Sequence, residues 1–527
     1  MRVRHVAFFV TLGAGACGGS CAGTTNGVDE RPPPVETQTK SYVSTEGDDN
    51  ADGSEATPFR TIMRALAGDA DVVVVRPGVY VEPEVAVARK VSVEGELGSV
   101  LAGHVLVASD DVRWSRVDVM GGISINLATN VEVTTATIGA GTREDTISVG
   151  SSQAALSQLV LKCGAETCVQ ATTSTASLTS VVMAPENASK RGVRAETSSV
   201  TVADVEVRGT SISQLQASGG SWMRVRGAKL NAAGGNALVA LRSTMLADDV
   251  TTSGSTQLGF LTQSSTVTLR GSTIGASTTL TAGVQAGRVT IFDSTLEGAP
   301  EGTLNLAAWR DDKPIVRLVR TNLAHGARVG VLQSTGTLIV EGGRFIGDPD
   351  APAAVERADA IVATGMDSRL MIRGAIFEDT AGTAIIGTRH LAATITATIS
   401  RPRLTGIFIE EARVFPVRIL GGKIEACQNE SGLVLLDVEG ARVEGLTVTG
   451  CPEAGVLTGE EAEVEVVGVR AIDNAGFGYA AFGGSTIRLR DSVARGSAWA
   501  TFSTCGDGAQ VIDAGGNQLS GPTTECP

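Results

Sequence analysis

Two short acidic segments in the middle of the chain contain the residues with the clearest potential for chemistry. Grouped carboxylates could act as acid, base or metal ligand, and an aromatic ring beside them could contact a ligand. The alternative interpretation is a pair of solvated acidic loops. The candidate ligand contacts are Trp309, Arg310, Asp311, Asp312, Asp348 and Asp350.

A second acidic pattern lies near the start of the chain. Asp48, Asn50, Asp52 and Gly53 have the spacing of the first half of a calcium-binding loop, in which oxygen ligands alternate and a glycine follows. The twelfth position of such a loop carries an acid, but here it is Phe59. The pattern is therefore a weak calcium site or a hydrogen-bonded turn, and apart from this weak calcium possibility we expect no cofactor.

Four further aspartates stand where other parts of the chain have glycine, and we interpret them as corner formers without a catalytic role. A residue that alternates with glycine at one repeat position supplies a tight or left-handed backbone. The aspartates are Asp204, Asp248, Asp293 and Asp491. The glycines are Gly227, Gly271, Gly342, Gly374, Gly421, Gly445 and Gly468.

These positions belong to a register that repeats from residue 91 to residue 511: aliphatic, any, aliphatic, any, Gly or Asp, any, any, aliphatic. Its mean period is about 23 residues, which is typical of solenoids. Examples are Val200-Val202-Asp204-Val207, Val267-Leu269-Gly271-Ile274 and Val417-Ile419-Gly421-Ile424.

The register predicts an all-β fold, a single-stranded right-handed parallel β-helix. Alternating aliphatic residues are typical of strands, and a unit this short must stack on its neighbours to bury its apolar face. The second aliphatic position should form one column inside the solenoid. We assign to it Val202, Val225, Leu246, Leu269, Ile291, Leu318, Val340, Ile372, Ile399, Ile419, Val443, Val466 and Leu489.

Three turns are longer than the rest, and long turns predict projecting loops. They span 27 residues from Val289 to Val316, 32 from Leu338 to Leu370, and 27 from Leu370 to Ala397. The first two of these turns contain the acidic segments. We therefore expect any ligand contact in this part of the solenoid.

The segment from Tyr42 to Tyr80 resembles the opening of bacterial surface β-helix proteins of the pectin-lyase-like group. The resemblance is carried by Tyr42-Val43-Ser44-Thr45-Glu46-Gly47-Asp48-Asp49, by Pro58-Phe59-Arg60-Thr61-Ile62, and by Val72-Val73-Val74-Val75-Arg76-Pro77-Gly78-Val79-Tyr80. It implies an opening strand and a short amphipathic helix, around Ile62 to Leu66, that cap the first coil. Many such proteins have no assigned reaction.

The same resemblance raises the possibility of a polysaccharide lyase, hydrolase or epimerase. Lyases of this fold combine acidic calcium ligands with a basic residue, and its hydrolases combine several aspartates with Gly-His-Gly and Arg-x-Lys. The nearest fragment here is Ala324-His325-Gly326, without the companion motifs. Trp114 occupies an inward position and is expected in the core. We therefore favour a non-enzymatic surface rod and keep the enzyme as the alternative.

The cysteines fit an oxidising compartment. Cys427 and Cys451 each lie ten residues after the start of their repeat, which predicts a disulfide between adjacent turns, continued as a polar column by Asn474 and Ser497. Two further candidate pairs are Cys163 with Cys168 and Cys505 with Cys526.

The first 16 residues have the pattern of an export signal: Arg2 and Arg4, an apolar stretch, and small residues before Cys17. Ala-Gly-Ala-Cys resembles a lipobox, so we expect lipidation of Cys17, with free secretion as the alternative. Residues 17–40 suit a flexible tether, 41–90 the cap and first coil, and 91–527 the β-helix.

We therefore expect a protein of the cell envelope, an outer-membrane lipoprotein attached to the membrane through its lipid. The net charge of -14 argues against nucleic acid as a partner. A polysaccharide or a surface protein is the expected ligand, and we expect a monomer.

Overall fold

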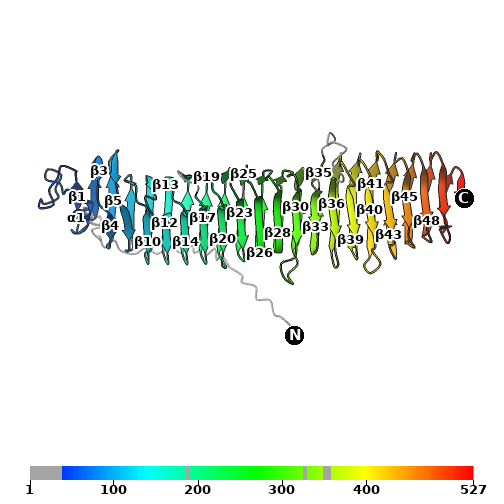
Figure 1. Cartoon of the computed structure of the whole chain (residues 1–527), viewed down its shortest axis with the longest axis horizontal. Helices are drawn as coiled ribbons and strands as arrows, with labels where there is room; N and C mark the ends of the chain where they lie inside the picture. Colours follow the sequence, from blue (N-terminus) through cyan, green and yellow to red (C-terminus); the bar gives the residue numbers. More distant parts are fainter. Residues whose placement is uncertain (1–37, 186–188, 325–328, 348–357, 526–527) are drawn as a thin grey trace, which may run out of the picture. The chain divides into compact units, whose positions relative to one another are not determined.

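The computed structural model describes residues 38–185, 189–324, 329–347 and 358–525. The described residues from Thr39 onward form one compact unit, which is a stack of short strands along one axis (Figure 1). It is an all-β parallel solenoid of about 19 turns, as the repeat predicts. Within the described ranges no helix is long and apolar enough to cross a membrane.

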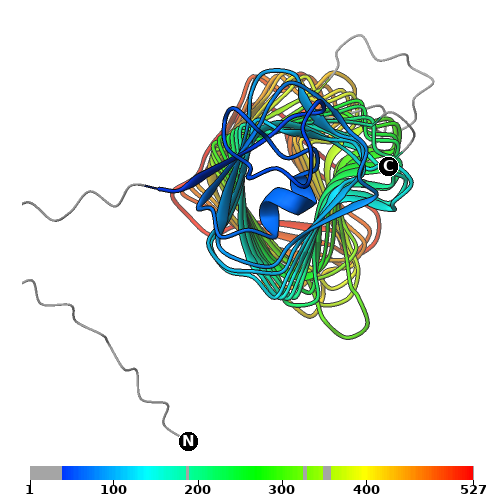
Figure 2. The ribbon, with the colours of Figure 1, turned by 90° about the vertical axis from the view of Figure 1, so that its left-hand side faces the viewer.

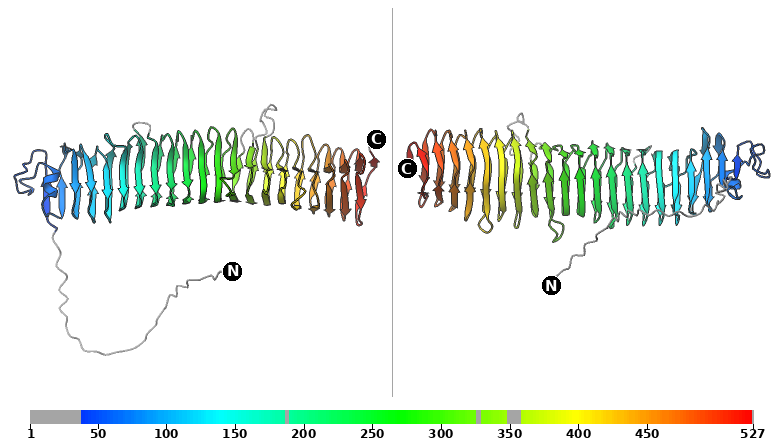
Figure 3. Two further views of the ribbon diagram at one scale, coloured as in Figure 1. Left: turned by 60° about the horizontal axis from the view of Figure 1, so that its bottom comes forward. Right: turned by 180° about the vertical axis from the view of Figure 1, so that it is seen from behind.

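Each turn contributes one strand to each of three parallel sheets, here called sheets A, B and C, and Figure 3 shows the stack from two further sides. One turn consists of β18 (Ser199–Ala203) in sheet A, β19 (Glu206–Arg208) in sheet B and β20 (Ser213–Ser218) in sheet C. The next turn pairs with it in register through β21 (Trp222–Arg226), β22 (Lys229–Asn231) and β23 (Asn236–Leu241).

Some strands continue from one sheet into the next around a corner. β26 (Leu258–Arg270) and β28 (Leu280–Phe292) run from sheet C into sheet A. Sheet A begins with β1 (Lys40–Val43), β2 (Val72–Val75), β5 (Val91–Gly95) and β8 (Val112–Ser115). It later contains β24 (Thr244–Asp248), β31 (Ile315–Val319), β34 (Thr337–Glu341), β37 (Arg369–Glu378), β39 (Ala392–Ser400), β41 (Val417–Glu425), β43 (Ala441–Glu444), β46 (Glu463–Val467), β49 (Thr486–Arg490) and β52 (Gln510–Asp513).

Sheet C begins with β4 (Glu84–Val87) and β7 (His104–Val107). Beyond β28 it continues through β30 (Gly302–Ala307), β33 (Val329–Gln333), β36 (Asp359–Thr364), β38 (Ile385–Thr388), β40 (Ile407–Glu410), β42 (Leu433–Leu436), β45 (Ala454–Gly459), β48 (Phe477–Phe482) and β51 (Ala500–Cys505). Because side chains alternate across each strand, half of them point into one continuous apolar core that runs the length of the solenoid.

The predicted inner column of sheet A is confirmed at eleven of its thirteen positions and wrong at two. Val225 pairs with Ala247, so Leu246 is the outward neighbour of the true core residue. Ile372 pairs with Ile395, whereas Ile399 pairs with Phe377 in sheet B. In both turns one of the inward residues is an alanine, Ala247 or Ala393. The prediction therefore placed the core position at a larger aliphatic residue nearby.

The corner interpretation is confirmed for Asp204, Asp293 and Asp491, whose φ angles are 51°, 47° and 52°. It is wrong for Asp248, which lies within β24. The left-handed residue is its neighbour Asp249, with φ of 55°. The seven glycines assigned to this position all have positive φ, so the column needs a left-handed backbone in every one of these turns.

A ladder of serines stabilises the corner that leads into sheet A. Ser152, Ser174, Ser198 and Ser221 lie in successive turns, and the backbone N–H of each of the first three donates to the Oγ of the next, at 3.0 to 3.2 Å. Ser243 and Ser265 repeat the contact further along. These serines are buried, so the ladder satisfies amides that would otherwise lack a partner.

Helix α1 (Ile62–Leu66) lies within the ring of coils when the solenoid is viewed from its N-terminal end (Figure 2). The Glu82 carboxylate accepts from the backbone N–H of Ile62 at 2.7 Å and from that of Met63 at 3.0 Å. Asp49 accepts from the N–H of Thr61 at 2.9 Å. Two carboxylates from different segments therefore hold the start of this short helix.

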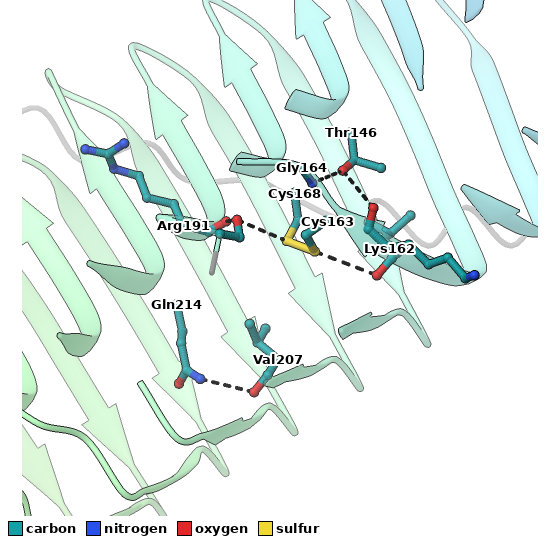
Figure 4. Close-up of a disulfide and its surroundings, with 10 residues drawn as sticks. Thr146, Lys162, Cys163, Gly164, Cys168, Arg191, Val207 and Gln214 are labelled. Atoms are coloured by element: carbon teal, nitrogen blue, oxygen red, sulfur yellow. Dashed lines mark hydrogen bonds between the residues drawn. A yellow bond between two sulfur atoms is a disulfide. The ribbon is translucent and has the colours of Figure 1, made fainter. Parts of the chain in front are cut away.

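Two of the predicted disulfides are present, Cys163–Cys168 (Figure 4) and Cys427–Cys451. The predicted polar column continues beside the second one, because Asn474 accepts the N–H of Cys451 through Oδ1 at 3.0 Å. Cys505 is buried at the end of β51. Its predicted partner Cys526 lies outside the described residues.

Candidate functional site

The segment with Trp309, Arg310, Asp311 and Asp312 forms a projecting loop, residues 308–314, between β30 and β31. It leaves the stack near β30 (Figure 1). Trp309 and Asp312 are joined by two backbone hydrogen bonds of 3.2 Å each, and Arg310 between them has φ of 57°. The four residues are exposed, with 43 % of the Trp309 surface accessible. The loop therefore has an ordered tip.

A hollow of about 360 Å³ lies between this loop and the two preceding turns. Arg288, Asp312 and Lys313 provide its charges, and Ser264, Ser265 and Thr266 provide hydroxyl groups. The hollow thus offers a polar ligand hydrogen-bond donors and acceptors, as well as positively and negatively charged groups. Lys313 is already held by Asp367, with 2.9 Å between Nζ and Oδ2.

Some charged side chains of the long turns have partners and some do not. Arg317 is paired with Glu341 in the next turn, and Arg344 with Glu378. In the described part of the chain, the side chains of Arg288, Arg310, Asp311 and Asp312 form no hydrogen bond or ion pair. Unpaired, exposed groups around a hollow keep their full capacity for a ligand.

The predicted turn lengths are confirmed for the first two long turns and wrong for the third. Val289 pairs with Val316 and Leu338 with Leu370, but Leu370 pairs with Ala393, so that turn has the ordinary length of 23 residues. Asp348 and Asp350 lie outside the described residues, as does Cys17. The structure therefore places only the first acidic segment.

A second cavity, of about 270 Å³, lies on the outer face of sheet C. Asp359, Glu410 and Glu430 contribute carboxylates to its lining, and Phe408 and Ile386 contribute apolar surface. Asp359 accepts the N–H of Thr383 at 2.7 Å. Among the described residues that line this cavity none is basic, and its three carboxylates are of the type that glycoside hydrolysis uses as acid and base or nucleophile.

The oxygens of the weak calcium motif are used in turns. The Oδ1 atom of Asp48 accepts from the backbone N–H of Asn50 at 3.0 Å, and that of Asp52 accepts from the N–H of Ser54 at 2.9 Å. The hydrogen bond from the Thr57 hydroxyl is the largest cause that lowers the pKa of Asp52 to about 2. Among the described residues no three His, Cys, Asp or Glu side chains gather where a metal ion could bind.

Two other tryptophans, Trp114 and Trp499, differ in exposure. Trp114 is fully buried and donates through Nε1 to the Val117 carbonyl at 3.1 Å, as its inward position predicts. Trp499 is 66 % exposed and packs edge to face against Phe477, with 5.5 Å between the ring centroids. Sequence reasoning missed Trp499 because its turn is regular in length and its neighbours are small.

Comparison with known proteins leaves the activity undefined. Residues 45–87 match a family described as a protein of unknown function, DUF1565. No curated protein sequence matches the chain. Among solved structures, the GH136 lacto-N-biosidase from Eubacterium ramulus is 10 % identical, with 63 % of this chain and 68 % of that chain covered and a TM-score of 0.32.

Two further solved structures are similar at the same low level. A mutant of the PL6 family alginate lyase AlyGC is 9 % identical, over 88 % of this chain and 99 % of that one, with a TM-score of 0.26. A GH87 alpha-1,3-glucanase catalytic domain is 11 % identical, over 91 % and 69 %, with a TM-score of 0.21. The protein is thus a parallel β-solenoid with an N-terminal segment similar to DUF1565, and its activity must be argued from its own residues.

Proposed function

We propose that this protein is an exported surface rod, attached to the cell envelope by lipid on Cys17, that binds a ligand through the 308–314 loop without catalysis. A polysaccharide or another surface protein is the expected ligand class. The observation that carries the proposal is the set of exposed, unpaired charges on the loop residues Arg310, Asp311 and Asp312, beside exposed Trp309. Asp312 also lines the hollow, together with the unpaired side chain of Arg288.

In this proposal the parallel solenoid is right-handed and α1 caps its first coil. The burial of Ile62, Ala65 and Leu66, and the contacts of α1 with β1, β2 and β4, support the capping role. A cap would cover strand edges that could otherwise pair with another chain. The tether of residues 17–40, which reaches the start of β1 at Lys40, would then connect the lipid to the rod.

The test is binding to a panel of neutral and acidic polysaccharides, with and without calcium. We expect Trp309→Ala, or replacement of residues 309–312 by Gly-Ser, to weaken binding at least tenfold. The temperature of thermal unfolding should not change, because Trp309 is exposed and a shorter loop changes the closure free energy only slightly. Trp222→Ala is the matched control, since Trp222 is 39 % exposed but lies on regular strand β21. Equal binding by the wild type and the loop variants would refute the location.

The enzymatic alternative is a lyase, hydrolase or epimerase of polysaccharides. It is favoured by one observation, the three carboxylates of Asp359, Glu410 and Glu430 in the sheet C cavity. The same panel tests it through the appearance of reducing or unsaturated ends, or of an epimerised sugar. Turnover that Glu410→Gln or Asp311→Asn abolishes would refute the non-enzymatic proposal.

A further inference from the structure

The outer face of sheet C changes character along the solenoid. After Ala86 and Leu106 in its first two turns, its central outward column is polar from Ser124 to Gln216, with Ser148, Gln170 and Arg194 between them in successive turns. From β23 onward the column contains no charged residue over eleven successive turns. Its members, here called the apolar stripe, are Val239, Leu261, Gly283, Asn305, Leu332, Val362, Ile386, Phe408, Val434, Leu457 and Ala480.

Sheet A provides the internal comparison, because it belongs to the same turns. Its central outward column, from Arg224 to Arg488, has twelve positions. Six of the twelve are charged: Arg224, Arg317, Arg418, Arg442, Glu465 and Arg488. A solvent-facing sheet of this protein is therefore normally charged, and the lack of charge along the stripe needs a separate explanation.

The stripe lies outside the solenoid core. Its residues alternate with inward ones such as Leu238, Ile407 and Tyr479, which belong to that core. At its C-terminal end Ala480 and Leu457 join Phe477, Phe482 and smaller residues in a second apolar cluster on the outer face. Depletion of charge with retention of aliphatic and aromatic side chains is typical of the central part of a protein interface.

In place of the monomer expected from the sequence, we propose that the apolar stripe is a dimer interface, covered by the same stripe of a second copy of this chain. Side chains along the stripe recur about every 4.8 Å over ten intervals. A partner must match that spacing over the full length of the stripe. A second copy of the solenoid does so because its own stripe has the same spacing. A two-fold axis near Val362, the middle member, overlays the two stripes completely in antiparallel orientation.

The available area is sufficient for a stable pair. Ten intervals of about 4.8 Å give a length of about 48 Å, and a six-residue strand such as β48 gives a width of about 20 Å. A patch of this length and width covers about 1,000 Å² on each copy, and within it Val239, Gly283, Val434 and Ala480 are already buried in the single chain. The total of about 2,000 Å² reaches the range of specific, stable interfaces.

The experiment is sedimentation velocity on the chain from residue 18 onward, which retains the whole compact unit that begins at Thr39. We expect twice the monomer mass at micromolar concentration. The apparent dissociation constant should fall as salt is raised, because two copies repel each other less when screened; the whole chain has a net charge of -14, and without Arg2 and Arg4 the tested chain has -16. A monomer at all concentrations up to about 0.1 mM would overturn the proposal. The dissociation constant would then exceed about 0.1 mM, which is far weaker than that of stable interfaces.

Two pairs of variants locate the interface. Ile386→Glu with Phe408→Glu should produce a monomer with unchanged circular dichroism, whereas Met371→Glu, an outward position of sheet A, should leave the dimer intact. Val362→Cys should be cross-linked between copies by a short bis-maleimide, because packed sheets lie about 10 Å apart, and Met371→Cys should not. A dimer that survives the double substitution, or cross-links equally at both cysteines, would refute the stripe as the interface.

Discussion

Arg320 and Asp293 occupy the same corner of successive turns and are joined by two hydrogen bonds, 2.6 Å from Nε to Oδ1 and 2.7 Å from Nη2 to Oδ2. Both have positive φ, 47° for Asp293 and 46° for Arg320. The corner column thus tolerates glycine, aspartate and even arginine, provided that the backbone turns left-handed. The Arg320 guanidinium also holds the pKa of Asp293 below its ordinary value.

The first prediction concerns that column. Asp204→Gly should leave local stability close to that of the wild type, because glycine adopts a φ of 51° without strain. Asp204→Val should cost about 1–2 kcal/mol, since its branched Cβ opposes the left-handed backbone. Hydrogen exchange of the amides of β18 and β21 is the measurement. Equal exchange in the two variants would contradict the corner interpretation.

The register could be predicted from sequence because it depends on short-range alternation that the chain repeats many times. The two misplaced core positions show its limit. At Leu246 and Ala247, hydrophobicity favours leucine, but burial is decided by pairing with Val225 in the previous turn. At Ile399, an equally good strand pattern belongs to sheet B. Only the three-dimensional pairing distinguishes these alternatives.

The candidate site also has one part that the sequence predicts and one part that it does not. The length of the turn from Val289 to Val316 identified the loop, because an insertion in a regular repeat must project. The hollow beside it could not be predicted, since Ser264 and Arg288 come from two earlier turns of ordinary length. The apolar stripe was also missed. It is visible only when residues about 23 positions apart are placed on one face.

The second prediction tests the serine ladder. Ser198→Ala should destabilise its turn by about 1–3 kcal/mol, because the buried N–H of Ser174 loses its acceptor. Faster exchange of the Ser174 amide is the expected readout. Ser177→Ala is the control, since Ser177 faces outward on the neighbouring strand. An unchanged Ser174 amide would mean that water replaces the lost hydroxyl.

The third prediction is a pH dependence at the N-terminal turns. Burial is the main cause that lowers the pKa of His104 below its ordinary value of 6.5, and Arg143 adds to it. Its Nδ1–H donates to the Gly122 carbonyl at 2.9 Å. His104 therefore binds a proton more readily in the unfolded chain than in the folded protein. The stabilisation is fully present above pH 6.5 and is lost as the pH falls toward the folded value.

This dependence can be followed by thermal unfolding and hydrogen exchange of β4 and β7 between pH 4 and pH 8, the range that contains the ordinary His pKa of about 6.5. His104→Gln should remove the part of the slope that arises from this residue. His390→Gln is the matched control, because His390 lies in a corner far along the chain. A slope that persists in His104→Gln would assign the effect to other groups.

The fourth prediction concerns the anchor. If Cys17 is acylated, the mature protein should partition into detergent and incorporate labelled fatty acid. Cys17→Ala should release it or block its processing, while Cys21→Ala should leave both properties unchanged. Recovery of the wild type in the aqueous phase with an unmodified N-terminus would instead indicate free secretion. Loop binding to a ligand would be unaffected by that result.

The disulfide between Cys427 and Cys451 also sets how the rod responds to force. A solenoid pulled from its C-terminal end loses its turns one after another, because each turn is held only by its neighbours. The described chain beyond Cys451, about 74 residues, would release about 250 Å of length at about 3.4 Å per residue. At Cys451 the disulfide carries the force directly to Cys427, so the chain between the two cysteines cannot extend. Reduction of the disulfide would release a further length of about 80 Å from this segment, whose ends are 24 residues apart.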